Sequence, residues 1–108
     1  MPVLLVERGN DKGQSLKIEP AKTYVVGREN EKASFQLNDP MASRAHFLIS
    51  SLNGAFRIRD MKSRNGTKLN DEKLPPESEA EIRIGDKVQV GETIFSFLSD
   101  EKEESATG

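Results

Sequence analysis

The chain has 108 residues, which is enough for one domain with a single hydrophobic core and too few for two. Lys and Arg total 16 and Asp and Glu total 18, so the formal net charge is only -2, and we expect neither nucleic acid nor a membrane surface as the partner. The absence of cysteine excludes disulfides and thiolate zinc sites and is consistent with a reducing compartment.

Short apolar pairs spaced i, i+2 follow one another along the chain, and this spacing indicates strands that bury one face. They occur in order at Leu4/Val6, Leu16/Ile18, Tyr24/Val26, Phe35/Leu37, Phe47/Ile49, Phe56/Ile58, Ile82/Ile84, Val88/Val90 and Phe95/Phe97. With shorter segments such as 67–69, we expect about eleven strands. No apolar run approaches the ~20 residues of a membrane span, and the first residues lack the basic start of a signal peptide. We therefore expect a soluble, cytoplasmic domain.

Turn residues separate these pairs at 10–13, 38–40, 53–54, 65–66 and 85–86. The Asn-Gly pairs at 53–54 and 65–66 predict type I′ hairpin turns, because both central residues of that turn need a positive φ. The one helix candidate, 72–84, is rejected because Pro75 and Pro76 interrupt it and Ile82 and Ile84 alternate. We predict an all-β sandwich of two antiparallel or mixed sheets over 1–99, followed by a disordered acidic tail or linker at 100–108.

Three polar clusters lie where predicted strands meet loops: Gly27-Arg28, Ser-Arg-Ala-His at 43–46, and Ser-Arg-Asn-Gly-Thr at 63–67. They supply guanidinium, hydroxyl and amide groups, but no paired carboxylates. This set of donors is typical of a site that holds an anion and not of one that turns over a substrate.

Together with Asp60, Asn70 and Gly85-Asp86, these clusters resemble the signature of the forkhead-associated (FHA) domain family, over a stretch of about 22–97. The resemblance implies an eleven-stranded β-sandwich with its binding loops at one end. It also implies a non-catalytic module in signal transduction that binds phosphothreonine-containing proteins or peptides and needs no cofactor.

The residues expected to bind the phosphopeptide are Arg28, Ser43, Arg44, Ser63, Arg64 and Asn65. The planar fork of Arg28 suits two phosphate oxygens at once, and the Ser43 hydroxyl suits a third. The alternatives are a surface arginine and a loop serine that bonds its own backbone.

Arg44 and Arg64 add positive charge to the same loops. Arg64 stands where related domains often carry a small hydroxyl residue, so it contacts the phosphate, reaches acidic peptide positions, or is simply solvated. The Asn65 amide can both donate to and accept from a peptide backbone, and its alternative role is in the turn with Gly66.

Structural support of the site is expected from Gly27, His46, Gly66 and Thr67. Ser43, His46 and Asp60 have the residue types of a hydrolase triad, but Ser43 lacks the surrounding small residues of a nucleophile elbow. The resemblance instead implies an architectural histidine that ties the binding loop. One histidine without cysteine excludes a typical zinc site.

Two other classes of function stay open: a β-sandwich that binds proteins independently of phosphate through a degenerate site, and, as a distant third, an enzyme. We expect a monomer. A further hypothesis is association through a phosphorylated tail, which contains Thr107.

Overall fold

The computed structural model describes residues 2–28 and 33–99, and within them the chain forms eleven strands and no helix, hence no helix that could cross a membrane. The strands are β1 (Pro2–Arg8), β2 (Ser15–Lys17), β3 (Thr23–Gly27), β4 (Phe35–Gln36), β5 (Phe47–Leu52), β6 (Ala55–Asp60), β7 (Lys68–Leu69), β8 (Glu72–Lys73), β9 (Glu79–Ile82), β10 (Lys87–Val90) and β11 (Thr93–Ser99). The predicted tail at 100–108, with Thr107, lies outside the described residues.

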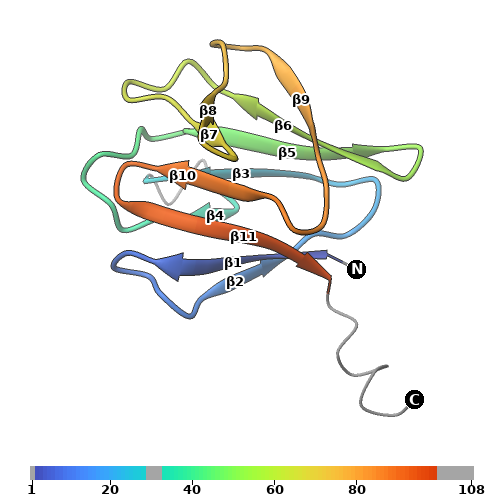
Figure 1. The fold of residues 1–108 in the computed structure, drawn as a ribbon, viewed down its shortest axis with the longest axis horizontal. Coiled ribbons are helices and arrows are strands. Elements are labelled where there is room, and N and C mark those ends of the chain that lie inside the picture. Colours follow the sequence, from blue (N-terminus) through green and yellow to red (C-terminus); the bar gives the residue numbers. More distant parts are fainter. Residues whose placement is uncertain (1, 29–32, 100–108) are drawn as a thin grey trace.

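The strands form two sheets, in the orders β2-β1-β11-β10-β7-β8 and β4-β3-β5-β6-β9 (Figure 1). Strand pairing is antiparallel except between β3 and β4. The alternating apolar residues of both sheets meet in one core: Phe47 of β5 and Phe95 of β11 pack edge to face with ring centroids 5.6 Å apart. Phe56 of β6 contacts Phe97 in the same way, also at 5.6 Å. The predicted β-sandwich is confirmed.

The strand predictions were incomplete in two places. The Ile82/Ile84 pair does not mark one strand, because β9 ends at Ile82 and Ile84 is 53% exposed. The chain turns there instead: the Asp86 carboxylate accepts the N–H of Arg83 at 2.9 Å. Strand β8 lies inside the rejected helix candidate and was not predicted separately, since its two residues are both exposed and show no apolar alternation.

The two Asn-Gly pairs behave differently. Asn53 and Gly54 have φ values of 55° and 82°, so the predicted hairpin turn forms between β5 and β6. At 65–66 only Gly66 has a positive φ, 84°, and the predicted type I′ turn is wrong. The Ser63 hydroxyl accepts the N–H of Gly66 at 3.0 Å, so a side chain and not a hairpin ladder shapes this loop.

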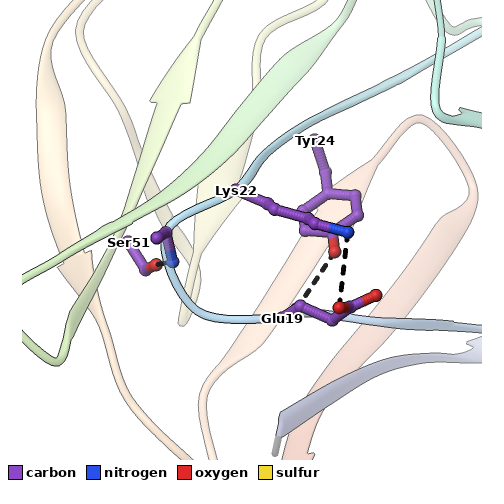
Figure 2. A network of polar contacts seen from close by, with 5 residues as sticks. Glu19, Lys22, Tyr24 and Ser51 are labelled. Carbon is purple, nitrogen blue, oxygen red and sulfur yellow. Dashed lines mark hydrogen bonds and ion pairs between the residues drawn. The ribbon is translucent and has the colours of Figure 1, made fainter.

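The connection between β2 and β3 is held by side chains, as Figure 2 shows. The Glu19 carboxylate lies 3.3 Å from the Lys22 ammonium, and the Tyr24 hydroxyl accepts the N–H of Glu19 at 3.1 Å. The Ser51 hydroxyl accepts the N–H of Ala21 at 2.6 Å. These contacts fix the chain where β3 begins. The polar clusters lie beyond the opposite end of β3.

Candidate functional site

Strand pairing alone brings the three polar clusters to one end of the sandwich. Val26, near the end of β3, pairs with Phe47 at the start of β5. Phe47 also pairs with Asp60 at the end of β6. Because both pairings are antiparallel, the residues after β3, before β5 and after β6 must lie beside one another. These residues carry the clusters at 27–28, 43–46 and 63–67.

Gly27 allows the first two clusters to touch. A Cβ atom at this position would stand 2.0 Å from the carbonyl oxygen of Arg44, so only glycine fits. Arg28 then donates its backbone N–H to the Ser43 carbonyl at 2.9 Å and its Nε–H to the Ala42 carbonyl at 3.0 Å. These bonds fix the base of the guanidinium group, whose other N–H donors lie on its two terminal nitrogens.

Two side chains join the loop before β5 to the loop after β6. The Ser43 hydroxyl oxygen accepts the N–H of Arg64 at 2.9 Å, and the Asn65 side-chain amide donates to the Met41 carbonyl at 2.7 Å. Accepting this bond leaves the Ser43 hydroxyl hydrogen to be donated elsewhere, and Asn65 keeps its side-chain carbonyl as an acceptor. The two residues therefore shape the site and still present polar groups.

His46 is fully buried and holds both loops from beneath. Its Nδ1 accepts the N–H of Ser43 at 2.9 Å, so Nδ1 carries no proton. Its Nε2–H accordingly donates to the Gly66 carbonyl at 2.8 Å. Burial lowers the pKa of His46 below its usual value, against the opposing effects of the Gly66 carbonyl and the nearby carboxylates. The neutral imidazole is the form that this geometry requires.

Asp60, only 1% exposed, organises the third cluster. Its carboxylate accepts the hydroxyls of Ser63 and Thr67, the latter at 2.7 Å, and the N–H of Ser63 at 3.1 Å. The Ser63 hydroxyl thus donates its only hydrogen to Asp60, and its oxygen accepts the N–H of Gly66. Thr67 is buried, in keeping with its expected supporting position.

Sequence reasoning missed Asp39, which is 4% exposed. Its carboxylate accepts the N–H of Met41 at 2.8 Å, the N–H of Glu92 at 3.1 Å and the hydroxyl of Thr93 at 2.7 Å. Burial raises its pKa, but these hydrogen bonds outweigh burial and lower the pKa overall. Asp39 thereby fastens the loop before β5 to the hairpin between β10 and β11. The turn residues at 38–40 were the only signal of it.

The clusters enclose a hollow of about 630 Å³, here called the loop hollow. It is lined by Arg28, Pro40, Met41, Ala42, Ser43, Arg44, Ala45, Arg64 and Asn65. Five of the six residues expected to bind the phosphopeptide therefore come together, and Ser63 does not line the hollow. Among the residues that the structure describes, three arginines and no acidic residue line it, although the whole chain carries a net charge of -2. The arrangement favours an anion.

The triad alternative fails on contacts. Both ring nitrogens of His46 bond backbone groups, and the Ser43 hydroxyl bonds the N–H of Arg64 instead of the imidazole. The Asp60 carboxylate is occupied by Ser63 and Thr67. A serine nucleophile needs a hydrogen bond from its hydroxyl to the base, and this geometry does not provide one.

Comparison with known proteins assigns the chain to a family. The family model described as "FHA domain" matches residues 24–91. The chain is 34% identical over 101 residues to the glycogen accumulation regulator GarA of Mycobacterium tuberculosis. The alignment covers 94% of this chain and 59% of GarA. It is 32% identical over 104 residues to an FHA domain-containing protein of Arabidopsis thaliana, covering 94% of this chain and 27% of that protein. The chain thus spans only part of the curated relatives it matches.

Solved structures show the same fold. An FHA domain of an Arabidopsis thaliana hypothetical protein superposes with a TM-score of 0.82 at 32% identity, over 91% of this chain and 86% of that one. The MEK1 FHA domain, solved in complex with the HOP1 pThr318 peptide, superposes with a TM-score of 0.78 over 92% of this chain and 96% of that one. Its identity is 22%, so this second likeness concerns the fold alone.

Proposed function

This chain belongs to the FHA domain family, and we propose that it is a non-catalytic module that binds phosphothreonine-containing peptides. The single observation that carries the proposal is the loop hollow, where three arginines and the Ser43 hydroxyl converge and no carboxylate of residues 2–28 or 33–99 lines the wall. A phosphate group carries about −1.5 to −2 charges at pH 7 and offers three acceptor oxygens, which match these donors.

We assign the phosphate to Arg28 and Ser43. The backbone and Nε contacts of Arg28 restrict its guanidinium group before any ligand arrives, which reduces the entropic cost of a two-pronged contact. Ser43 has a hydroxyl hydrogen left to donate, because its oxygen already accepts the N–H of Arg64. Arg44 and Arg64, both exposed, add charge at the rim.

Asn65 is assigned to the peptide backbone, since its side-chain carbonyl can accept a peptide N–H while its amide holds Met41. We reassign Ser63 from phosphate binding to support, because its hydroxyl donates to Asp60 and it stands outside the loop hollow. His46, Gly27, Gly66 and Thr67 keep the supporting roles expected of them.

The decisive experiment compares matched threonine and phosphothreonine peptides by isothermal titration calorimetry. We expect measurable binding only with phosphate present, weakened by added salt and by a pH below ~6, where the phosphate becomes a monoanion. Equal affinity for both peptides would contradict the proposal and favour the phosphate-independent sandwich. A phosphoserine peptide tests the preference for threonine, which rests on family membership alone.

We further propose that the module works in the cytoplasm as a recruiter of phosphorylated proteins. The chain has no cysteine, and a phosphate ligand depends on kinases in its own compartment. The mycobacterial relative is named as a regulator, which agrees with a binding role and not a catalytic one.

A further inference from the structure

On the premise of the proposed function, we propose that a second hollow, next to the loop hollow, binds one flank of the same phosphopeptide in extended form. This second hollow, here called the edge groove, measures about 630 Å³. Gln14 and Ser15 line it on one side, Ser34, Gln36 and Asn38 line it on the other, and Arg28 stands at its border.

Arg28 makes the two hollows continuous. Among the described residues it alone lines both of them, so a peptide whose phosphate meets this guanidinium group has the edge groove directly beside it. Peptide segments extend from both sides of a phosphothreonine, and the edge groove can receive only one of these two segments. The occupant is therefore the segment on one side of the phosphothreonine.

The walls of the edge groove belong to the outermost strands of the two sheets, β2 and β4. The residues on either side of β2 bond to β1: Ile18 donates its N–H to the Pro2 carbonyl at 2.9 Å, and the Gln14 carbonyl accepts the N–H of Val6 at 2.9 Å. Antiparallel pairing alternates, so the N–H and C=O of Ser15, between these two residues, point away from β1. An outer strand with such groups is a template for strand addition by an extended peptide.

Side-chain amides supply further backbone-matching groups. The Gln36 amide donates to the Arg28 carbonyl at 3.3 Å and keeps its side-chain oxygen as an acceptor. The Gln14 side chain forms no hydrogen bond with residues 2–28 or 33–99 and is exposed. Because these groups match the peptide backbone and not particular side chains, the groove suits flanks of varied sequence.

The groove is also preformed. The Asp11 carboxylate accepts the N–H of Asn38 at 2.6 Å, and the Asn10 amide donates to the Asn38 carbonyl at 2.9 Å. These two bonds tie the turn between β1 and β2 to the segment after β4, which holds the two walls at a fixed separation. Binding there therefore requires little rearrangement of the backbone.

The test uses a short phosphothreonine peptide and two longer ones, each extended by about six uncharged residues on one side, a length of ~20 Å when fully extended. We expect one extension to raise affinity by about fivefold or more, and the other to have little effect. Gln14→Ala should reduce the gain. Ser15→Pro should remove it, because proline lacks the outward N–H and an outer strand tolerates proline there. Neither variant should change the affinity for the short peptide.

Gln89→Ala is the matched control, since Gln89 lies on β10, outside the edge groove, and its amide bonds the nearby Gly91 carbonyl. The inference is overturned if neither extension raises affinity, if the gain persists in Gln14→Ala and Ser15→Pro, or if Gln89→Ala removes it instead. Should Ser15→Pro fail to fold, Gln14→Ala decides alone. Failure of the short peptide to bind would overturn the proposed function as well, so the two failures are distinguishable.

Discussion

The hydroxyl oxygen of Ser43 accepts the backbone N–H of Arg64 at 2.9 Å, across 21 positions of the sequence. One small side chain thus sets the distance between two loops that line the loop hollow. The same hydroxyl retains a hydrogen, so the group that joins the two loops can also donate to the phosphate of the proposed ligand.

Replacement of Ser43 should separate these effects. In Ser43→Ala the phosphate loses a donor and the N–H of Arg64 loses its partner, so we expect affinity to fall by about tenfold or more and stability by about 1 kcal/mol. Ser43→Thr keeps the hydroxyl and should retain most of the affinity. Calorimetric titration and urea unfolding measure the two quantities. Unchanged affinity in Ser43→Ala would remove this residue from the phosphate contact.

Arg28→Ala should reduce phosphopeptide affinity by about a hundredfold or more, because each hydrogen bond to a charged group contributes about 1.5–3 kcal/mol. Arg28→Lys keeps the charge but loses the planar fork, and we expect an intermediate loss. The side chain is exposed, but its bond to the Ala42 carbonyl is lost as well, so we expect stability to fall by about 1 kcal/mol. The matched control is Arg57→Ala, an exposed arginine on β6 outside the loop hollow, which should bind normally.

The stability of the unliganded protein should fall as pH decreases below about 6.5. The pKa of His46 is lowered in the folded state, so between the unfolded value and the folded value only the unfolded chain takes up the proton. Stability is therefore full above the unfolded pKa and declines towards the folded pKa, by at most ~1.4 kcal/mol per pH unit.

Urea unfolding across pH 5 to 7.5 measures this decline. His46 is the single histidine, so His46→Ala should flatten the profile in this range while lowering stability at pH 7.5 by at least about 2 kcal/mol, because two buried backbone groups lose their partner. A wild-type profile that is flat from pH 7.5 to 5 would contradict the assigned neutral imidazole.

Asn65→Asp should weaken phosphopeptide binding by about tenfold or more. A carboxylate cannot donate to the Met41 carbonyl, and its negative charge would repel the phosphate that we propose binds in the loop hollow. Asn53→Asp is a matched control in the β5–β6 turn, where aspartate also tolerates a positive φ. Fluorescence anisotropy with a labelled phosphopeptide compares the two. Equal binding by both variants would show that Asn65 does not face the ligand.

The positions of most strands along the chain and the residue types of the candidate site could be predicted from the sequence, because both depend on local patterns. Period-two alternation places Phe47 and Phe56 in strands regardless of their partners. The residue types of the clusters at 27–28, 43–46 and 63–67 predict an anion-binding site. The role of Asp60 as a buried acceptor could not be predicted, because its partners Ser63 and Thr67 act through geometry and not through spacing alone.

The Asn-Gly pairs show where local reasoning fails. Asn53-Gly54 lies between two strands that pair with each other, and the predicted turn forms. Asn65-Gly66 follows β6 without a partner strand, and contacts from Ser63 and His46 determine its path instead. A turn preference of this kind is overridden by side-chain contacts, one from the same loop and one from His46, 20 positions away in the sequence.

By itself, the sequence determined that this chain is an all-β domain and that its arginines, serines and asparagine gather in three short clusters at strand ends. Only the tertiary structure decided how those clusters come together and which of their groups contact one another. Antiparallel pairing of β3, β5 and β6 brings them to one end, the close approach at Gly27 sets Arg28 against the Ser43 loop, and His46 ties that loop to Gly66. The physical reason is that residue types are local, whereas a binding site depends on distances between groups far apart in the chain.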